Sequence, residues 1–220
     1  MVDVIFNGPA GRLEGRYFQN KSPRAPMAIF LHPHPQHGGT MDNKLVYLMY
    51  DAFRKLGFST LRFNFRGVGR SQGSFDNGEG ELSDAAAAMD WMQAQNPNSI
   101  GCCVAGFSFG SWIGMQLLMR RPDIDAFISL APPANLYDFN FLAPCPSSGM
   151  IVQGLSDEIV KDTDVEKLVK KLSSQKGISI DYRTVKGADH FFANHMDILR
   201  DHINDYIKTK VAQIFRQKGA

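Results

Sequence analysis

One serine in this chain stands in a sequence that can make a hydroxyl group nucleophilic. Ser108 is the centre of Gly106-Phe107-Ser108-Phe109-Gly110, which follows the apolar run at residues 102–105 and opens a helix-like stretch at residues 112–119. A Gly-x-Ser-x-Gly sequence between a strand and a helix forms a sharp turn that lifts the serine hydroxyl over the edge of a sheet. The glycines are required because a Cβ on either side would collide across this turn. Ser108 is therefore the candidate nucleophile.

A serine hydroxyl is a poor nucleophile at neutral pH and needs a neighbouring base. The chain has six histidines. His190 follows the last predicted strand by a few residues, in a loop that can bring an imidazole over the edge of the sheet, whereas His195 and His202 fall near or within the next helix. Position along the chain favours His190 as the base.

The imidazole in turn needs an acid that fixes its tautomer and stabilises the imidazolium. Asp157 follows the predicted strand at residues 150–153 and lies between Ser108 and His190 in the sequence. Glu158 is the nearest rival, and a second interpretation of Asp157 is a residue that only shapes its own turn. The order Ser108, Asp157, His190 predicts a catalytic triad.

Attack on a carbonyl creates an oxyanion, which two N–H groups must stabilise. Phe109 offers one of them, directly after the serine and at the positive end of the following helix. The second is expected from the loop after residues 27–31, where Pro33 and Pro35 have no N–H and His34 is the best main-chain donor. Phe109 and His34 are the predicted oxyanion hole.

Alternating strands and helices are expected to position these residues. A hairpin and six further apolar segments, separated by helical stripes, indicate a mostly parallel sheet of about eight strands with helices on both faces. Ligands bind such sheets beyond the carboxyl ends of the strands, where the triad residues fall. Thr163 and Glu166 predict a capping box for one helix. No repeat or linker interrupts the pattern, so residues 1–220 are predicted to form a single domain. The strands are expected at residues 2–6, 12–18, 27–31, 58–65, 100–105, 126–131, 149–153 and 178–183, and the helices at 45–56, 82–92, 112–119, from 163 and from 196.

Composition excludes several classes of protein. A net charge of +2 provides no field that favours nucleic acid or an anionic membrane. Three cysteines, two of them adjacent in a predicted strand, do not indicate a disulfide framework. No apolar run approaches the roughly 20 residues of a membrane span, and the first residues lack the layout of a signal peptide. We expect a cytoplasmic protein that needs no cofactor or metal and acts on a small molecule, without a nucleic-acid or membrane partner.

The serine turn, the histidine-containing loop, Asp157 and His190 together resemble the α/β-hydrolase superfamily. More narrowly, the chain resembles small bacterial hydrolases that are similar to dienelactone hydrolases and prolyl-oligopeptidase-like esterases. The motifs that carry the narrower resemblance lie at residues 31–35, 38–44, 62–69 and 106–110. The resemblance implies the α/β-hydrolase fold and a serine hydrolase that cleaves a small acyl ester through an acyl-enzyme. Dienelactone hydrolases themselves have a cysteine at the turn, so the serine here departs from their pattern.

The segment at residues 132–148 is too short for the helical cap domain that some α/β-hydrolases carry. Three interpretations of its apolar side chains remain open: a rim or flap of the site, a satellite of the core, or a subunit contact that would make the protein a homodimer. The side chains concerned are Leu136, Tyr137, Phe139, Phe141 and Leu142.

Other activities compete with esterase chemistry. A peptidase or a thioesterase would use the same triad, since amides and thioesters pass through the same tetrahedral intermediate. His32, His34 and His37 have a spacing that metal sites also use, so a metal-dependent hydrolase is an alternative. A third alternative is a hydrolase fold retained as a non-catalytic binding module. Arg66 and Arg70 are candidates for contact with an anionic substrate, although loop arginines are commonly just solvated.

Overall fold

The computed structural model describes residues 1–219, and eight strands in it form one sheet. The strands are β1 (Val2–Gly8), β2 (Gly11–Phe18), β3 (Met27–Leu31), β4 (Ser59–Phe63), β5 (Cys102–Phe107), β6 (Ile124–Leu130), β7 (Gly149–Gly154) and β8 (Ile180–Val185). Their order across the sheet is β1-β2-β4-β3-β5-β6-β7-β8. Only the pairs β1–β2 and β2–β4 are antiparallel; every other neighbouring pair is parallel.

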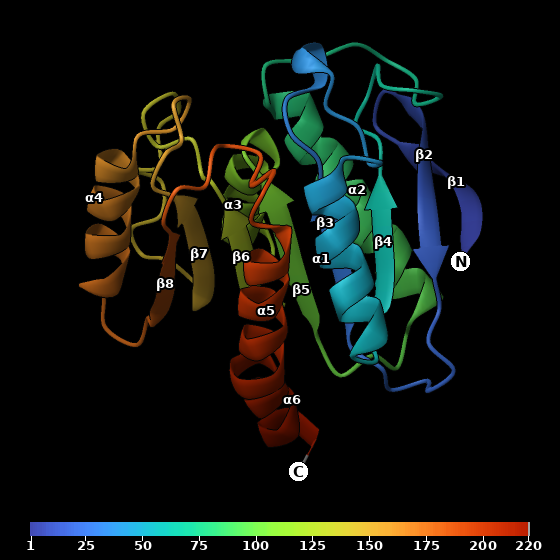
Figure 1. Ribbon diagram of the computed structural model, residues 1–220. Coiled ribbons are helices and arrows are strands. Elements are labelled where there is room, and N and C mark those ends of the chain that lie inside the picture. Colours follow the sequence, from blue (N-terminus) through green and yellow to red (C-terminus); the bar gives the residue numbers. More distant parts are fainter. Residues whose placement is uncertain (220) are drawn as a thin grey trace.

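Helices cover both faces of this sheet (Figure 1). They are η1 (Pro35–His37), α1 (Lys44–Lys55), α2 (Glu79–Gln95), α3 (Phe109–Arg120), α4 (Asp162–Ser173), α5 (Met196–Tyr206), η2 (Ile207–Val211) and α6 (Ala212–Gly219). The helices α1, α5 and α6 pack on one face, and α2, α3 and α4 pack on the other, so that each face has its own apolar core. This is the mostly parallel α/β architecture that the sequence predicts.

Burial on both faces explains why the central strands are apolar throughout. In β3, Ala28 and Phe30 face the core under α1 and α5, while Met27, Ile29 and Leu31 face the core under α2 and α3. All five side chains are buried. Successive strand residues point to opposite faces, so a strand covered on both sides has no position for a solvated side chain.

Two local predictions need correction. The helix after β7 begins at Asp162, one residue before Thr163, with Lys161 at its N-cap and no capping hydrogen bond from a side chain. The predicted capping box of Thr163 and Glu166 is therefore wrong. The last predicted helix is interrupted by η2, a π-helical turn between α5 and α6.

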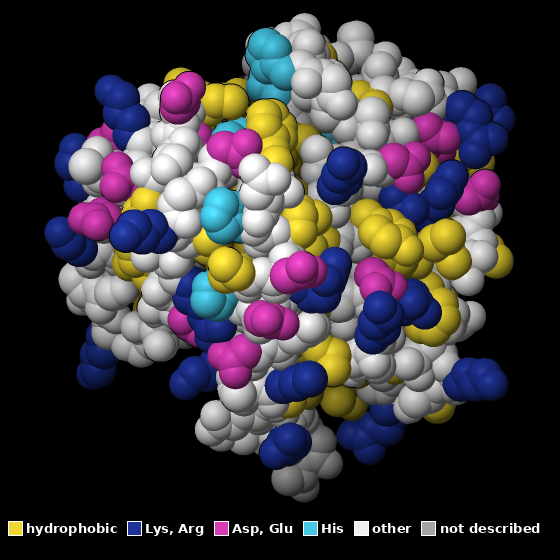
Figure 2. Space-filling model, in the orientation of Figure 1, with side chains coloured by type: hydrophobic (Ala, Val, Ile, Leu, Met, Phe, Trp, Pro, Cys, Tyr) yellow, Lys and Arg dark blue, Asp and Glu magenta, His cyan; other side chains and the backbone are white. Residues whose placement is uncertain are grey.

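The parallel strands send their carboxyl ends to one edge of the sheet, the upper edge in Figure 1. The turn after β5 and the loops after β3, β7 and β8 meet there, and these segments hold all the predicted site residues. On the face formed by α1 and α5, basic side chains are interspersed with acidic ones (Figure 2). Among residues 1–219, no helix combines the length and hydrophobicity that crossing a membrane requires.

Candidate active site

Ser108 occupies the turn between β5 and α3 in a strained backbone conformation, with φ 53° and ψ −120°. A Cβ at Gly106 would overlap the carbonyl of Gly110, and one at Gly110 would overlap the carbonyl of Leu31. Only glycine fits at either position. A positive φ is costly for a residue other than glycine and persists where the surrounding structure enforces it. The sequence Gly-x-Ser-x-Gly thus forms the predicted turn.

The structure brings the three predicted triad residues together. His190 Nε2 lies 3.1 Å from Ser108 Oγ, and His190 Nδ1 lies 2.7 Å from Asp157 Oδ2. Because the carboxylate accepts the Nδ1 proton, the lone pair of Nε2 faces the serine hydroxyl. The His190 ring is 5% exposed and packs against Phe107, with ring centroids 5.0 Å apart.

Asp157 has both roles that the sequence left open, since one carboxylate oxygen shapes its own turn and the other orients His190. Its Oδ1 accepts the backbone N–H groups of Ile159 and Val160 at 2.8 Å and so shapes the turn. Its Oδ2 accepts His190, and also the amide of Gln153 at 3.2 Å. Burial opposes ionisation, but the hydrogen bonds from His190 and from these backbone groups outweigh it and lower the pKa of Asp157. The carboxylate is therefore charged at neutral pH.

The other acids near the triad have different roles. Glu158 is exposed to solvent. Asp162 accepts the N–H of Thr163 at 2.8 Å, and Asp189 accepts the N–H of Ala193 at 3.0 Å. In the described part of the chain, none of the three forms a hydrogen bond with the His190 ring, so Asp157 alone occupies the position that orients the imidazole.

The loop after β3 brings His34 beside Ser108. The first turn of α3 lies so close to the end of β3 that only glycine fits at position 110. The ring of His34 packs 5.0 Å from that of Phe109, and both residues line one cavity with Ser108 and His190. Phe109 is the first residue of α3, where N–H groups have no partner within the helix. The structure places both predicted oxyanion donors at the site; that their N–H groups hold an oxyanion stays a prediction.

His32 does not share a metal site with His34 and His37. It is fully buried, its Nε2 accepts the N–H of Phe65 at 3.0 Å, and its Nδ1 donates to the carbonyl of Pro33 at 2.7 Å. Burial lowers its pKa to about 4, so the ring is neutral. Both ring nitrogens are thus engaged, and no cluster of three or more potential metal ligands occurs among residues 1–219. The metal-site interpretation of these histidines is wrong.

Buried polar residues of β4 and of the segment after it hold the loop that follows β3. The sequence analysis did not predict this role. Asn64 Oδ1 accepts the N–H of Met41 at 2.7 Å, and Arg62 donates to the carbonyl of Met41 at 2.8 Å. With the His32–Phe65 contact, these bonds fix the segment at residues 32–43 against its neighbour. The only sequence signal was the occurrence of Arg62 and Asn64 in an otherwise apolar strand region.

The active-site cavity has a volume of about 440 Å³. Its polar side chains are those of Ser108, Asn43, Tyr137 and three histidines, and no Lys, Arg, Asp or Glu is among the residues that line it. Its lining consists of Pro33, His34, His37, Gly38, Gly39, Asn43, Ser108, Phe109, Pro133, Leu136, Tyr137, Ile159, His190 and Phe191. Arg66 and Arg70 do not line it; they pair with Asp84 and Glu14, respectively.

The segment at residues 132–148 is both a rim of the site and a satellite of the core. Leu136 and Tyr137 line the cavity, whereas Phe139, Leu142 and Cys145 are buried in the core under α2, α3 and α4. In the described residues, no helix lies between β6 and β7. The site therefore has no helical cap.

A sequence model of the family described as X-Pro dipeptidyl-peptidase (S15 family) matches residues 16–143, more than half of the chain. The chain belongs to the S15 family. Uncharacterized protein RP471 of Rickettsia prowazekii is 53% identical to this S15 member over 213 residues, which cover 95% of this chain and 90% of that protein.

Solved structures agree with this assignment. ATU1826 of Agrobacterium tumefaciens, a protein of unknown function, is 59% identical and superposes with a TM-score of 0.94 over 96% of this chain and 97% of that chain. XC6422 of Xanthomonas campestris, an α/β serine hydrolase without a lid, is 33% identical with a TM-score of 0.84 over 94% and 93% of the two chains. This S15 member is an α/β serine hydrolase in fold and family.

Proposed function

We propose that this protein hydrolyses small acyl esters through an acyl-enzyme formed on Ser108. The observation that supports it is the continuous hydrogen-bonded chain from Ser108 Oγ through His190 to Asp157, beside a cavity that no Lys, Arg, Asp or Glu lines. Nucleophile, base and orienting acid lie within hydrogen-bond reach of one another, as acyl transfer requires. We further propose that the protein works in the reducing cytoplasm, because its three cysteines are free and buried.

The reaction has two halves. His190 Nε2 takes the hydroxyl proton as Ser108 Oγ bonds to the acyl carbon, and the N–H groups of Phe109 and His34 stabilise the resulting oxyanion. The tetrahedral intermediate collapses, the bond to the leaving oxygen breaks, and His190 returns its proton to that oxygen. Water then attacks the acyl-enzyme in the same way, which releases the acid and restores Ser108. Asp157 stabilises the imidazolium in both halves.

A peptidase is the second candidate, because the matching family is described as X-Pro dipeptidyl-peptidase. An enzyme that removes dipeptides from an amino terminus must recognise the free ammonium group, and a carboxylate is the usual partner for a desolvated cation. No Asp or Glu is among the residues that line the cavity, and Asp157 is occupied by His190. The lining thus favours an uncharged ester over a charged peptide end.

The experiment compares the parent protein with Ser108→Ala on p-nitrophenyl acetate and on an X-Pro p-nitroanilide. Ser173→Ala, at the exposed end of α4, is the matched control. We expect the ester to be hydrolysed faster than the anilide, kcat to fall roughly 10⁶-fold in Ser108→Ala, and the control to retain the parent rate. Equal ester hydrolysis by Ser108→Ala and the parent protein would overturn the proposal.

A further inference from the structure

Three large apolar side chains stand exposed around the mouth of the active-site cavity. Leu136 is 59% exposed, Phe191 53% and Ile159 47%, and we call these three residues the apolar rim. A single exposed apolar residue is ordinary on a protein surface, but several around one cavity indicate a binding surface. Ser108 lies in the lining of this same cavity.

Hydrogen bonds hold the apolar rim in place. The side chain of Asn135 donates to the carbonyl of Ile159 at 3.0 Å, which joins the segment after β6 to the turn after β7. The N–H of Ile159 donates in turn to Asp157 Oδ1. The carboxylate that orients His190 therefore also positions Ile159, so this rim residue and the triad are held by the same side chain.

An aromatic stack supports Tyr137, the neighbour of Leu136 in the cavity lining; we call Leu136, Tyr137 and Ile159 the apolar wall. Tyr137 stacks on Trp112 with ring centroids 4.2 Å apart, and Trp112 Nε1 donates to the carbonyl of Asp138 at 3.1 Å. Tyr137 also contacts the ring of Phe109, the predicted oxyanion residue. A preformed apolar wall binds a ligand without the entropic cost of ordering a loop.

The wall contains no group that could neutralise a charged acyl chain. None of the residues that line the cavity is a Lys, Arg, Asp or Glu, and burial of His34 lowers its pKa, as does its neighbour His37, so its ring is neutral at neutral pH. A carboxylate or ammonium placed against Leu136, Tyr137 and Ile159 would lose its hydration without gaining an ion pair. Aliphatic and aromatic carbon atoms would gain from the same burial.

Resting on the proposed function, we propose that the acyl group of the substrate is an uncharged apolar chain that lies against Leu136, Tyr137 and Ile159. The carbonyl oxygen is directed to Phe109 and His34, and the leaving oxygen to His190. The acyl chain takes the remaining direction, along the wall. This subsite makes chain length the main determinant of specificity: each methylene buried there raises kcat/KM about fourfold, until the wall is covered.

The test uses p-nitrophenyl esters from acetate to octanoate, and p-nitrophenyl hydrogen succinate as a charged counterpart of the pentanoate ester. Leu136→Ala and Ile159→Ala each remove part of the apolar surface of the wall. Leu155→Ala and Ile198→Ala are matched controls, since these side chains are 43% and 47% exposed but do not line the cavity. All four positions are exposed, so the variants retain the core.

We expect kcat/KM to rise about fourfold per methylene in the parent protein and in both controls. The rise should be clearly smaller in Leu136→Ala and Ile159→Ala, because each change removes apolar surface that the longer acyl chains would cover. The succinate ester should react at least about 100-fold more slowly than the pentanoate ester.

A chain-length dependence that is absent, or equal in wall variants and controls, would overturn the subsite while Ser108-dependent acetate hydrolysis left the proposed function intact. Loss of a dimer in Leu136→Ala, seen by sedimentation without a change in chain-length dependence, would instead make the rim a subunit contact and also overturn the subsite. If no ester is hydrolysed, both proposals fall.

Discussion

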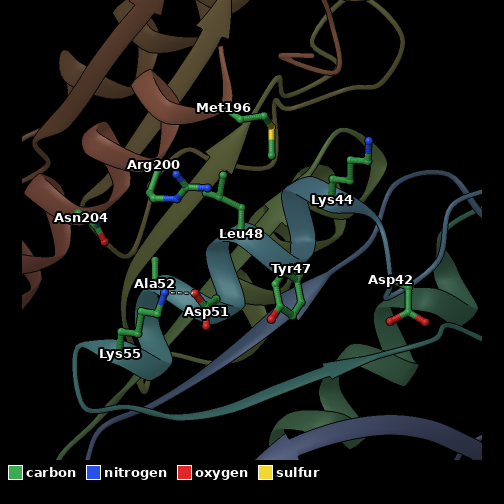
Figure 3. Close-up of a pocket in the computed structure, with 10 residues that line it drawn as sticks. All are labelled: Asp42, Lys44, Tyr47, Leu48, Asp51, Ala52, Lys55, Met196, Arg200 and Asn204. Atoms are coloured by element: carbon green, nitrogen blue, oxygen red, sulfur yellow. Dashed lines mark ion pairs between the residues drawn. The ribbon is translucent and has the colours of Figure 1, made fainter. Parts of the chain in front are cut away.

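Two cavities of similar volume have very different chemistry. The active-site cavity measures about 440 Å³. The second, which we call the helix-pair cavity, measures about 370 Å³ and lies between α1 and α5 (Figure 3). They are close neighbours, since Asn43 lines the first while Asp42 and Lys44 line the second.

Four of the five charged side chains that line the helix-pair cavity form ion pairs, namely Asp42, Asp51, Lys55 and Arg200. Asp51 accepts from Arg54 and from Lys55 at 2.7 Å, and the latter ion pair is drawn in Figure 3. Arg200 pairs with Asp197 at 2.6 Å along α5. Surface pairs of this kind, three or four residues apart on a helix, contribute a few tenths of a kcal/mol to the helix.

The active-site cavity has the opposite organisation. The carboxylate of Asp157 is fully buried behind its lining, and none of the residues that line the cavity is a Lys, Arg, Asp or Glu. A serine and an imidazole lie at its floor in mutual contact. The comparison shows that cavity size does not identify a site. What distinguishes the site is a reactive pair held in a fixed geometry by a buried charge.

The largest expected effect comes from neutralising Asp157, and neutralising Asp51 in the helix-pair cavity is its control. Asp157→Asn should lower kcat for p-nitrophenyl acetate by about 10⁴-fold, because an amide neither fixes the required imidazole tautomer nor stabilises the imidazolium. Asp51→Asn makes the same chemical change in the helix-pair cavity and should leave kcat within about twofold. Steady-state kinetics on the two purified variants gives both numbers, and comparable losses in both would remove the distinction between the cavities.

The next effect concerns the pH dependence of stability. Burial lowers the pKa of His32 to about 4 in the folded protein, against about 6.5 in an unfolded chain. Between pH 4 and pH 6.5 the unfolded state binds more protons at His32 than the folded state does. The contribution of His32 to the free energy of unfolding is therefore fully present above pH 6.5, and about 3 kcal/mol of it is lost as the pH falls to 4. Urea unfolding at pH 7 and at pH 4 measures it.

The test variant for this effect is His32→Gln, and the control is Gln36→Ala, at an exposed position of the same loop that carries no titrating group. We expect the drop in unfolding free energy between pH 7 and pH 4 to shrink by about 3 kcal/mol in His32→Gln and to stay unchanged in Gln36→Ala. An unchanged drop in both variants would show that His32 is not held neutral.

A smaller effect is expected from Gln153, which is fully buried and donates to Asp157 Oδ2. Gln153→Met removes a hydrogen bond to a charged group and should lower kcat roughly tenfold, with KM unchanged. Gln175→Met, in a position whose amide bonds the backbone at Leu142 and Cys145, should lower stability but not kcat. A KM effect in place of a kcat effect would mean that Gln153 does not act through the triad.

The smallest effect should follow from Lys44→Ala and Arg200→Ala in the helix-pair cavity. Surface substitutions of this kind change stability by less than about 0.5 kcal/mol, and kcat/KM should stay within about twofold for the whole ester series. A selective loss with long-chain esters would show that the substrate extends from the active-site cavity into the helix-pair cavity.

The sequence predicts those strands and site residues that a pattern of neighbouring residues is enough to identify. The central strands are recognisable because burial on both faces requires apolar residues throughout, and Ser108 is recognisable because only glycine fits on either side of its turn. Asp157 and His190 follow from their places after two strands of a parallel sheet.

Contacts between distant segments could not be predicted in this way. The bonds from His32 to Phe65 and from Asn64 to Met41 depend on the pairing of β3 with β4, which no local pattern specifies. Gln153 looked like an ordinary strand residue, and its role appears only once the turn at Asp157 folds back over it. The capping pattern of Thr163 was misleading because the helix already begins at Asp162, with Lys161 at its N-cap, so Thr163 lies within the first turn.

The most direct measurement of the central claim is covalent labelling with a fluorophosphonate, followed by mass spectrometry of the proteolysed protein. A serine activated by His190 should acquire a single phosphonyl adduct, on the peptide that contains Ser108, with matching loss of ester hydrolysis; Ser108→Ala should acquire none. An unlabelled Ser108 in an active protein, or equal labelling of the Ser108→Ala variant, would contradict the account.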